Sequence, residues 1–392
     1  MKVKYSDLTV VLLCLTFYEV TILPHSFFLA FKYLVLIGVF LRYCKVRGNH
    51  YAILGFLLLF GAVTGVSSIL NGMPTNTIVA SLMFAVQILD IYLVCIYYIE
   101  NRSIWGLVEI VMGTFLALLL VNDALMLFVH YDFSSPNEEY FIGNKFIVSY
   151  VHCFVSALIF MMTNKEGVQT VAVHRGKIQI KRSTGLAISI LFAVYSILIC
   201  AKVTCSTGMI SCIVLLCLMF IPGWMRVLIS SNKIIIISAA VINILVLGSA
   251  SILSLPFFEN IIYEVFGKSY TWTGRLLIWA RIFELFREAP LLGHGYYNST
   301  VVDIVGFGNP QNGVLKILID AGVLGLISYC TIVWRSFRTA KTGFLPGLYP
   351  LIAFTYAMIA ASIVEINLTH MIVFMAMAIY YVENTNVREI AK

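Results

Sequence analysis

The sequence predicts an all-α integral membrane protein with about 12 transmembrane helices. Hydrophobic residues make up 60% of the 392 residues and charged residues only 11%, whereas soluble domains carry about 25% charged residues. The mean hydropathy is +0.94. Apolar runs of the roughly 20 residues that a helix needs to cross a bilayer follow one another along the chain. Runs such as 241–255 are apolar on every face, which excludes the alternating pattern of a transmembrane β-barrel.

Hydropathy and helix breakers place the expected spans in order. They cover residues 7–23, 27–43, 51–70, 76–98, 104–128, 145–163, 184–201, 208–225, 234–255, 313–334, 346–365 and 369–382. The first run shows no small-residue cleavage pattern, so we expect it to remain as a span. No internal repeat or soluble domain interrupts the series, and residues 1–392 are therefore expected to form a single polytopic membrane domain.

The basic residues predict how the chain is oriented. The net charge is +7, and lysines and arginines gather in alternate joints between the expected spans, with the largest group between residues 165 and 182. The positive-inside rule places these joints and both termini in the cytoplasm. Because the same rule accounts for the positive charge, nucleic acid is not an expected partner. The nine cysteines form no CxxC pair and have no histidine at ligand spacing, which argues against a metal site or a disulfide framework.

Two of the outward-facing joints are longer than simple connectors. Residues 130–144 are acidic, and residues 256–312 form a large external loop between expected spans 9 and 10. Long structured loops between spans are usually functional. The middle of the larger loop, about 273–288, has helix signals, with Thr273 as a candidate N-cap and Pro290 as a stop. We expect an amphipathic helix there, which lies on the membrane surface or caps the bundle and forms part of the active site.

Two arginines of this helix are candidate cations. Arg275 lies in the first turn, on the mainly apolar side beside Trp279. A guanidinium and the free N–H groups of a helix N-terminus together favour a phosphate oxygen, and anchoring to a lipid headgroup is the alternative. Arg281 shares a face with Glu284 and Glu288, so it is either a solvated, ion-paired residue or a second cation of the site.

Three motifs occur in order within and after the loop. They are Thr273-Gly274-Arg275 with Trp279, then Pro290-Leu291-Leu292-Gly293-His294-Gly295, and then Gln311-Asn312-Gly313 with Asp320, Gly322 and Gly325. Together they resemble the signature of the O-antigen ligase and polymerase superfamily, which includes the Wzy polymerases. The resemblance implies an all-helical fold like that of the class C glycosyltransferases.

The resemblance also implies an activity. Members of the superfamily are metal-independent glycosyltransferases that need no cofactor and use an undecaprenyl-pyrophosphate-linked oligosaccharide at the outer face of the bacterial cytoplasmic (inner) membrane. A polymerase of O-antigen or capsule is favoured over a ligase because Gln311 stands where many ligases carry histidine, and an amide cannot act as a base. The expected partners are the lipid-linked oligosaccharide, membrane lipid and a chain-length regulator protein.

Such a transfer needs cations for the pyrophosphate and a group that deprotonates the acceptor hydroxyl. Arg275, Arg281 and Lys202 are the expected cations, with Lys32 as a fourth because it is a charge in the outer half of the second span. His294 is the expected general base, since imidazole accepts protons near neutral pH. The alternative is that this histidine only shapes a turn between two glycines.

Other assignments stay open at this stage. Asp303, Glu259 and Asp132 are alternative bases, and leaving-group stabilisation without a strong base is a further possibility. Gln311 and Asn312 are expected either to bind sugar hydroxyls or to cap the span that follows.

Three further acidic residues lie inside other expected spans. Glu19 and Asp123 lie near the outer ends of their spans, where pairing with Lys32 or Lys202 is expected. Asp90 lies near mid-membrane and favours a competing hypothesis, a lipid-linked glycan flippase or another transporter. The inverted repeats and paired broken helices that are typical of transporters are not evident. An O-antigen ligase of the same superfamily is the other alternative.

Overall fold

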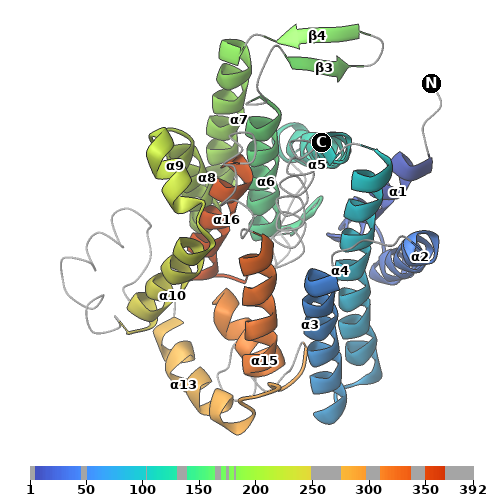
Figure 1. Cartoon of the computed structure of the whole chain (residues 1–392), viewed down its shortest axis with the longest axis vertical. Coiled ribbons are helices and arrows are strands. Elements are labelled where there is room, and N and C mark those ends of the chain that lie inside the picture. The colour runs from blue at the N-terminus through green and yellow to red at the C-terminus, as the bar shows by residue number, and fades with distance from the viewer. Residues whose placement is uncertain are drawn as a thin grey trace.

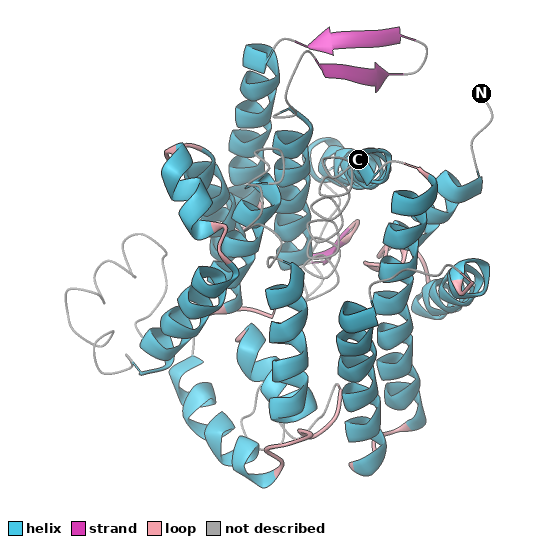
Figure 2. Ribbon diagram, in the orientation of Figure 1, coloured by secondary structure: helices cyan, strands magenta, loops and turns pink. Residues whose placement is uncertain are grey.

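The computed structural model describes residues 5–45, 51–102, 104–129, 139–163, 169–173, 176–180, 182–248, 275–296, 310–336 and 349–366. Over these residues the chain is almost entirely helical (Figures 1 and 2). The helices are α1 (Tyr5–Leu15), α2 (His25–Tyr43), α3 (Tyr51–Leu70), α4 (Thr75–Asn101), α5 (Ile104–Ala124), a π-helical turn η1 (Leu125–Val129), α6 (Lys145–Thr163), α7 (Arg182–Lys202), α8 (Ser206–Met219), α9 (Gly223–Ile229), α10 (Asn232–Gly248), α13 (Arg275–Glu288), α15 (Gly313–Ser336) and α16 (Tyr349–Ser362).

The strands in the described part form two short antiparallel hairpins. In the first, β1 (Glu139–Tyr140) pairs with β2 (Gly143–Asn144). In the second, β3 (Gln169–Val173) pairs with β4 (Gly176–Ile180). Neither hairpin belongs to a larger sheet, so the helices alone build the body of the protein.

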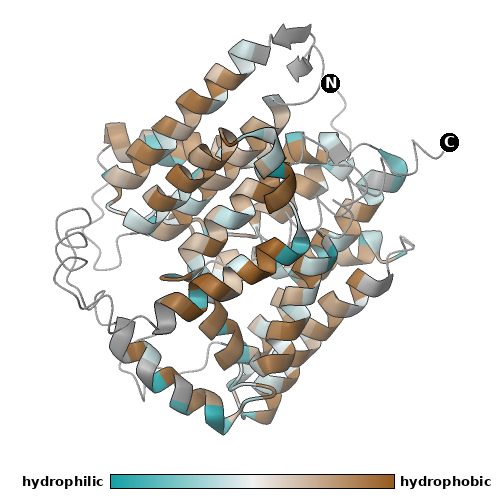
Figure 3. Ribbon diagram, turned by 60° about the vertical axis from the view of Figure 1, so that its left-hand side comes forward, coloured by the Kyte–Doolittle hydropathy of each residue, from teal (hydrophilic) through white to brown (hydrophobic). Residues whose placement is uncertain are grey.

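The described helices are those of a multi-pass membrane protein. Seven of them are long and apolar enough to cross a membrane, or eight if α9 and α10, which meet at a 75° bend, form one span. Helices α1, α8 and α16 are apolar but shorter. Figure 3 shows hydrophobic residues along most of the length of these helices. The all-α membrane class is confirmed, whereas the count of 12 spans stays a prediction, and its last span, 369–382, lies outside the described residues.

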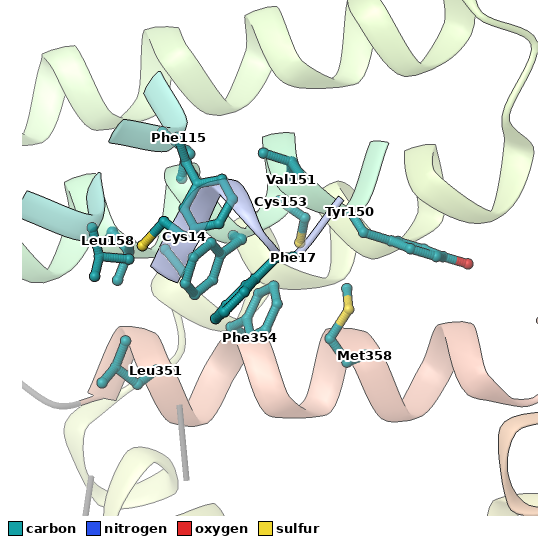
Figure 4. Packing of buried hydrophobic residues seen from close by; sticks show 14 of the residues in the cluster. Cys14, Phe17, Phe115, Tyr150, Val151, Cys153, Leu158, Leu351, Phe354 and Met358 are labelled. Carbon is teal, nitrogen blue, oxygen red and sulfur yellow. The ribbon is translucent and has the colours of Figure 1, made fainter. Parts of the chain in front are cut away.

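Helix α6 lies at the centre of the bundle. It contacts α5, α7, α8 and α16, and 78% of its apolar window is buried. Aromatic rings connect these helices: the ring of Phe154 on α6 lies 5.5 Å from both Phe115 on α5 and Phe354 on α16. Phe17, just after α1, extends the cluster to Phe115 at 5.9 Å (Figure 4). Such ring pairs add to the energy of simple burial and hold α5, α6 and α16 together.

The two ends of the bundle differ. The β3–β4 hairpin lies at one end and α13 lies at the other, which we call the α13 end (Figure 1). Helix α15 starts near α13 and packs against α3, α10 and α13. Of the expected external loop 256–312, the structure describes only residues 275–296 and 310–312.

Candidate functional site

Helix α13 is the amphipathic helix that the sequence predicts at about 273–288. Ile278, Trp279, Ile282 and Leu285 are buried and pack with Leu315 and Ile319 of α15, whereas Arg281, Glu284, Arg287 and Glu288 are exposed. The indole Nε1 of Trp279 donates to the carbonyl oxygen of Pro310 at 3.1 Å. Of the two expected placements, the contacts therefore favour a helix that caps the bundle.

Helix α15 is broken near its middle. Gly322 has φ +62° and ψ −163°, which interrupts the helical hydrogen bonding. The segment that follows α13 fills the break with four backbone hydrogen bonds: His294 N–H to Ile319 O (2.6 Å), Gly295 N–H to Asp320 O (3.1 Å), Val323 N–H to Pro290 O (2.9 Å) and Leu324 N–H to Leu291 O (3.2 Å). Irregular backbone at membrane depth is tolerated only where protein satisfies its polar groups, so this segment makes the break possible.

The glycines of this contact have no room for a side chain. A Cβ atom on Gly293 would lie 2.5 Å from the carbonyl oxygen of Ile319, and one on Gly322 would lie 2.3 Å from the carbonyl carbon of Leu291. Gly293 and Gly295 also have φ of +71° and +96°. We call Gly293-His294-Gly295 the glycine turn. Its glycines and Gly322 are therefore required by backbone approach as well as by φ.

Helix α3 holds the glycine turn from the other side. The Ser67 hydroxyl and the Asn71 side-chain amide each donate to Gly293 O at 3.1 Å. The Tyr296 N–H donates to the Ser68 hydroxyl at 3.0 Å. The turn is consequently fixed between α3 and α15.

His294 also helps to hold the glycine turn in place. Its residue is 8% exposed, and its Nε2 lies 2.8 Å from the carbonyl oxygen of Leu285. Because a carbonyl oxygen only accepts, Nε2 carries the proton in this hydrogen bond. His294 therefore helps to shape the turn, and its role as the general base stays a prediction.

Asn312 acts as the N-cap of α15. Its side-chain oxygen accepts from Leu315 N–H at 2.9 Å, as N-cap residues do. Its amide nitrogen donates to Asn243 Oδ1 on α10 at 3.1 Å and to Ile363 O, just after α16, at 2.9 Å. Asn312, with 0% exposure, thus joins three helix ends. Gln311 beside it has a positive φ of 48°.

The predicted site residues fall into separate groups. Asn312 and Asp320 are eight residues apart on α15, or about 12 Å at the helical rise, so Gln311 and Asn312 lie well away from the glycine turn. The hydrogen bond from Trp279 to Pro310 instead places Gln311 and Asn312 near the first turn of α13, which begins at Arg275. The side chain of Arg275 lies outside the described part, as do Asp303, Glu259 and Asp132.

The remaining predicted cations lie on other elements. Arg281 is exposed on α13. Lys202 is exposed at the end of α7, which packs mainly against α6 and α8. Lys32 is half-buried on α2, where the charge of Glu19 acts on it, and Glu19 is itself 2.9 Å from Nδ1 of His25.

A buried polar cluster that the sequence did not predict lies between α5, α6 and α7. Asp123 accepts from Nε2 of His152 at 3.3 Å, from the Tyr195 hydroxyl at 2.6 Å and from the Asn122 amide at 3.2 Å. Nδ1 of His152 lies 3.2 Å from the Ser196 hydroxyl. The expected pairing of Asp123 with Lys32 or Lys202 is therefore wrong, because His152 takes that place. In the sequence, this cluster could have been indicated by His152, the single histidine within the apolar run of α6.

A second missed residue is Glu365. It follows α16, is 9% exposed, and comes two residues after the Ile363 carbonyl that Asn312 binds. Burial raises the pKa of the Cys205 thiol, and the negative charge of Glu365 adds to this increase. Cys205 is the N-cap residue of α8. The signal in the sequence was an acidic residue at the end of an apolar span.

Comparison with known families bears on these same elements. Residues 187–330 match the family model of the O-antigen ligase family. The match covers less than half of the chain and supports a relation of this segment to the O-antigen ligase and polymerase superfamily. The superfamily segment runs from α7 to α15 and contains α13, the glycine turn and the break at Gly322. No curated protein matches the chain significantly.

The superfamily segment does not contain every residue of interest. Glu365, Asp123 and Lys32 lie outside residues 187–330. Asn312 connects the segment to the chain beyond α16, through Ile363. Within the described residues, no group of three or more histidine, cysteine or acidic side chains is arranged to hold a metal ion.

Proposed function

We propose that this protein is a polymerase of a bacterial surface polysaccharide, O-antigen or capsule. It transfers the growing glycan from undecaprenyl pyrophosphate to a lipid-linked repeat unit at the outer face of the cytoplasmic membrane. The observation that carries the proposal is the family match over residues 187–330. This segment contains α13, the glycine turn and the first part of α15, and α13 packs against α15.

The chemistry of the proposal needs no metal ion. The acceptor hydroxyl oxygen attacks the anomeric carbon, and the bond to the pyrophosphate oxygen breaks as undecaprenyl pyrophosphate leaves. Fixed cations stabilise the charge that develops on this leaving group. Arg275 supplies one at the N-terminus of α13, whose free N–H groups also favour anions, and Arg281, Lys202 and Lys32 add positive charge. Gln311 borders the sugar site beside the α15 cap.

The proposal includes an orientation in the membrane. The α13 end faces the periplasm, and the β3–β4 hairpin and both chain termini lie in the cytoplasm. The basic joints support this orientation, because the hairpin lies within residues 165–182, where lysines and arginines gather. Membrane lipid and a chain-length regulator protein are the proposed partners besides the lipid-linked oligosaccharide.

Within the superfamily, Gln311 supports a polymerase over a ligase, because an amide side chain cannot replace the histidine of many ligases as a base. The decisive experiment incubates purified protein with a synthetic undecaprenyl-pyrophosphate repeat unit and analyses the products on a gel. A ladder of polymer lengths is the expected result. Transfer only to lipid A core identifies a ligase instead.

A transporter is a second candidate because of Asp90. This residue on α4 is 0% exposed, and neither carboxylate oxygen has a hydrogen-bond partner among the described residues. Buried acidic residues in spans often mark ion or proton pathways. Movement of a labelled lipid-linked glycan across proteoliposomes, without any polymer formed, is the result that favours this candidate over the polymerase.

A further inference from the structure

Asp90 is a buried carboxyl group for which the described residues provide no partner. It lies near the middle of α4 and is 0% exposed. Neither of its oxygens has a hydrogen-bond partner in the described part of the chain. Burial of an ionised carboxylate costs far more free energy without a paired charge or a donor than with one. The charge of an ionised Asp90 would therefore be uncompensated.

A second acceptor without a donor lies one turn before Asp90. Gln87 is also 0% exposed, and its side-chain Nε2 donates to both the carbonyl oxygen and the hydroxyl of Thr16 at 3.1 Å. These two hydrogen bonds fix which end of the carboxamide faces the end of α1, yet its Oε1 has no partner among the described residues. Residues three apart are neighbours on a helix surface, with about 5–6 Å between their Cβ atoms. Gln87 and Asp90 therefore place three acceptor oxygens without a described donor within one turn.

The described surroundings of this turn supply no cation. Ile91, the next residue, lines a small cavity between α1, α4 and α5 that is bounded by hydrophobic side chains and thiols. Helix α3, which packs along α4, carries no charged residue. On α1, α2 and α5, the groups that carry or take up charge near neutral pH are Asp7, His25, Lys32, Arg42, Glu109 and Asp123. No hydrogen bond or ion pair between described residues links any of them to Asp90.

Asp123 shows which partners an ionised buried aspartate has in this protein. It is 3% exposed and accepts from His152, Tyr195 and Asn122 at 2.6–3.3 Å. Such donors stabilise the ionised form of a carboxyl group. Asp90 is at least as buried and has none of these donors, so the two aspartates differ in the charge that their surroundings accommodate.

From this difference we propose that Asp90 is a proton-binding site that is occupied in the described conformation. The bound proton makes one carboxyl oxygen a donor, and Gln87 Oε1 is the acceptor that it satisfies. Release of the proton leaves an uncompensated charge, so it requires that water or a cation reaches this turn of α4. Proton binding at Asp90 is therefore coupled to the packing of α4 against α1 and α2. The inference holds for either candidate function, because it depends only on the surroundings of Asp90.

Infrared spectroscopy of the purified protein at neutral pH tests the proposal directly. A protonated carboxylic acid has a C=O stretching band that ionised carboxylates and amides lack, and we expect Asp90→Asn to lose the wild-type band. Asp123→Asn is the matched control at a buried aspartate and Glu109→Gln the control at an exposed carboxylate; both should keep the band. Gln87→Leu should keep the band but shift it to higher frequency, because the acid loses its acceptor. An unchanged band in Asp90→Asn overturns the proposal.

Thermal stability measured against pH is the second test, and it needs no assay of turnover. An unfolded aspartate is ionised above about pH 4, so folding of the wild-type protein takes up one proton that Asp90→Asn does not need. The wild type should therefore lose stability relative to Asp90→Asn as the pH rises, by up to about tenfold in the unfolding equilibrium constant per pH unit. Equal pH dependence of the two proteins overturns the proposal. Stabilisation of the wild type by sodium but not potassium ions, absent in Asp90→Asn, also overturns it, because a sodium ion then occupies the site.

Discussion

The imidazole of His294 donates to the Leu285 carbonyl while the flanking backbone bonds to Ile319 and Asp320. Asn312 uses both ends of its side-chain amide to join α10, α15 and the turn after α16. Both side chains hold backbone segments together. Asp123, for which the sequence predicted a lysine partner, is a buried carboxylate whose partners His152 and Tyr195 come from other helices. At the scale of single residues, the role of a polar side chain in this bundle depends on its hydrogen-bonding partners from other elements rather than on its neighbours in the sequence.

The first prediction concerns His294. Asparagine also holds turns by hydrogen bonding but accepts no proton, so His294→Asn should keep near-normal turnover with an unchanged pH profile. His294→Ala should lower thermal stability because it removes the bond to Leu285. The measurements are polymer yield against pH and thermal denaturation in detergent. If His294→Asn loses most turnover together with the acid limb of the profile, the histidine transfers protons after all.

A second residue-scale prediction compares two tyrosine hydroxyls. Tyr195 donates to the Asp123 carboxylate at 2.6 Å, whereas Tyr356 donates to the neutral Ile229 carbonyl at 2.8 Å. Hydrogen bonds to charged groups contribute about 1.5–3 kcal/mol and neutral ones about 0.5–1.5 kcal/mol. Tyr195→Phe should therefore lower the free energy of unfolding more than Tyr356→Phe, as measured by thermal or denaturant unfolding. Equal losses would mean that the Asp123 cluster adds no charge-assisted bond.

At the scale of elements, α15 consists of two helical parts joined at Gly322, and the segment after α13 supplies the backbone partners that the break requires. This explains why a signature of the superfamily combines glycines from the loop with glycines from the following span. They meet in one contact, where Gly293 faces Ile319 and Gly322 faces Leu291. Helix α13 is fixed to the same span through Trp279 and its buried face.

Replacement of Gly322 by alanine tests the break. The strain of a glycine-only backbone conformation costs about 1–3 kcal/mol, and the contact of the new Cβ with Leu291 adds to it. Gly322→Ala should therefore unfold at a clearly lower temperature and lose activity. Gly113→Ala is the control, because Gly113 lies on α5 with nothing within 4 Å of an added Cβ, and it should be at least as stable as the wild type. Equal melting temperatures for the two variants would contradict the steric argument.

The start of α13 carries the fourth prediction. Arg275→Ala should abolish polymer formation without loss of expression or thermal stability, because it removes a cation from the proposed pyrophosphate site. Arg275→Lys should restore activity only in part, since an ammonium lacks the planar, two-pronged donor geometry of a guanidinium. Arg287→Ala, at the exposed end of the same helix, should behave like the wild type. Normal polymer yield in Arg275→Ala would remove this residue from the site.

At the scale of the whole molecule, α13 and the β3–β4 hairpin lie at opposite ends of a helical bundle (Figure 1). In this view α3, α4, α6 and α7 run along the axis that joins the two ends, whereas α2 and α5 are seen nearly end-on. The proposed chemistry at the α13 end and the basic joints at the hairpin end are therefore separated by the thickness of the bundle. Orientation in the membrane follows from whichever of the two ends is exposed to the periplasm.

Cysteine labelling tests the orientation. In a cysteine-depleted background, Asn298→Cys should react with a membrane-impermeant maleimide on intact cells or spheroplasts, because the proposal places this loop outside. Lys177→Cys, in β4, should react only after permeabilisation. The readout is the mass shift of the labelled protein. The reverse pattern would invert the topology and move the proposed active face to the cytoplasm.

The sequence by itself determined the membrane class, most helix positions, the bounds of α13 to within about two residues and the order of the superfamily motifs. These features depend on composition and on patterns within one segment, where local hydropathy and helix signals act directly. Only the tertiary structure decided which polar groups meet. Ser67 and Gly293 are 226 residues apart in the chain, Asp123 pairs with His152 rather than with a lysine, and the Ile363 carbonyl after α16 accepts from Asn312, which caps α15. Such pairings depend on how the helices pack in three dimensions, and hydropathy patterns do not specify that packing.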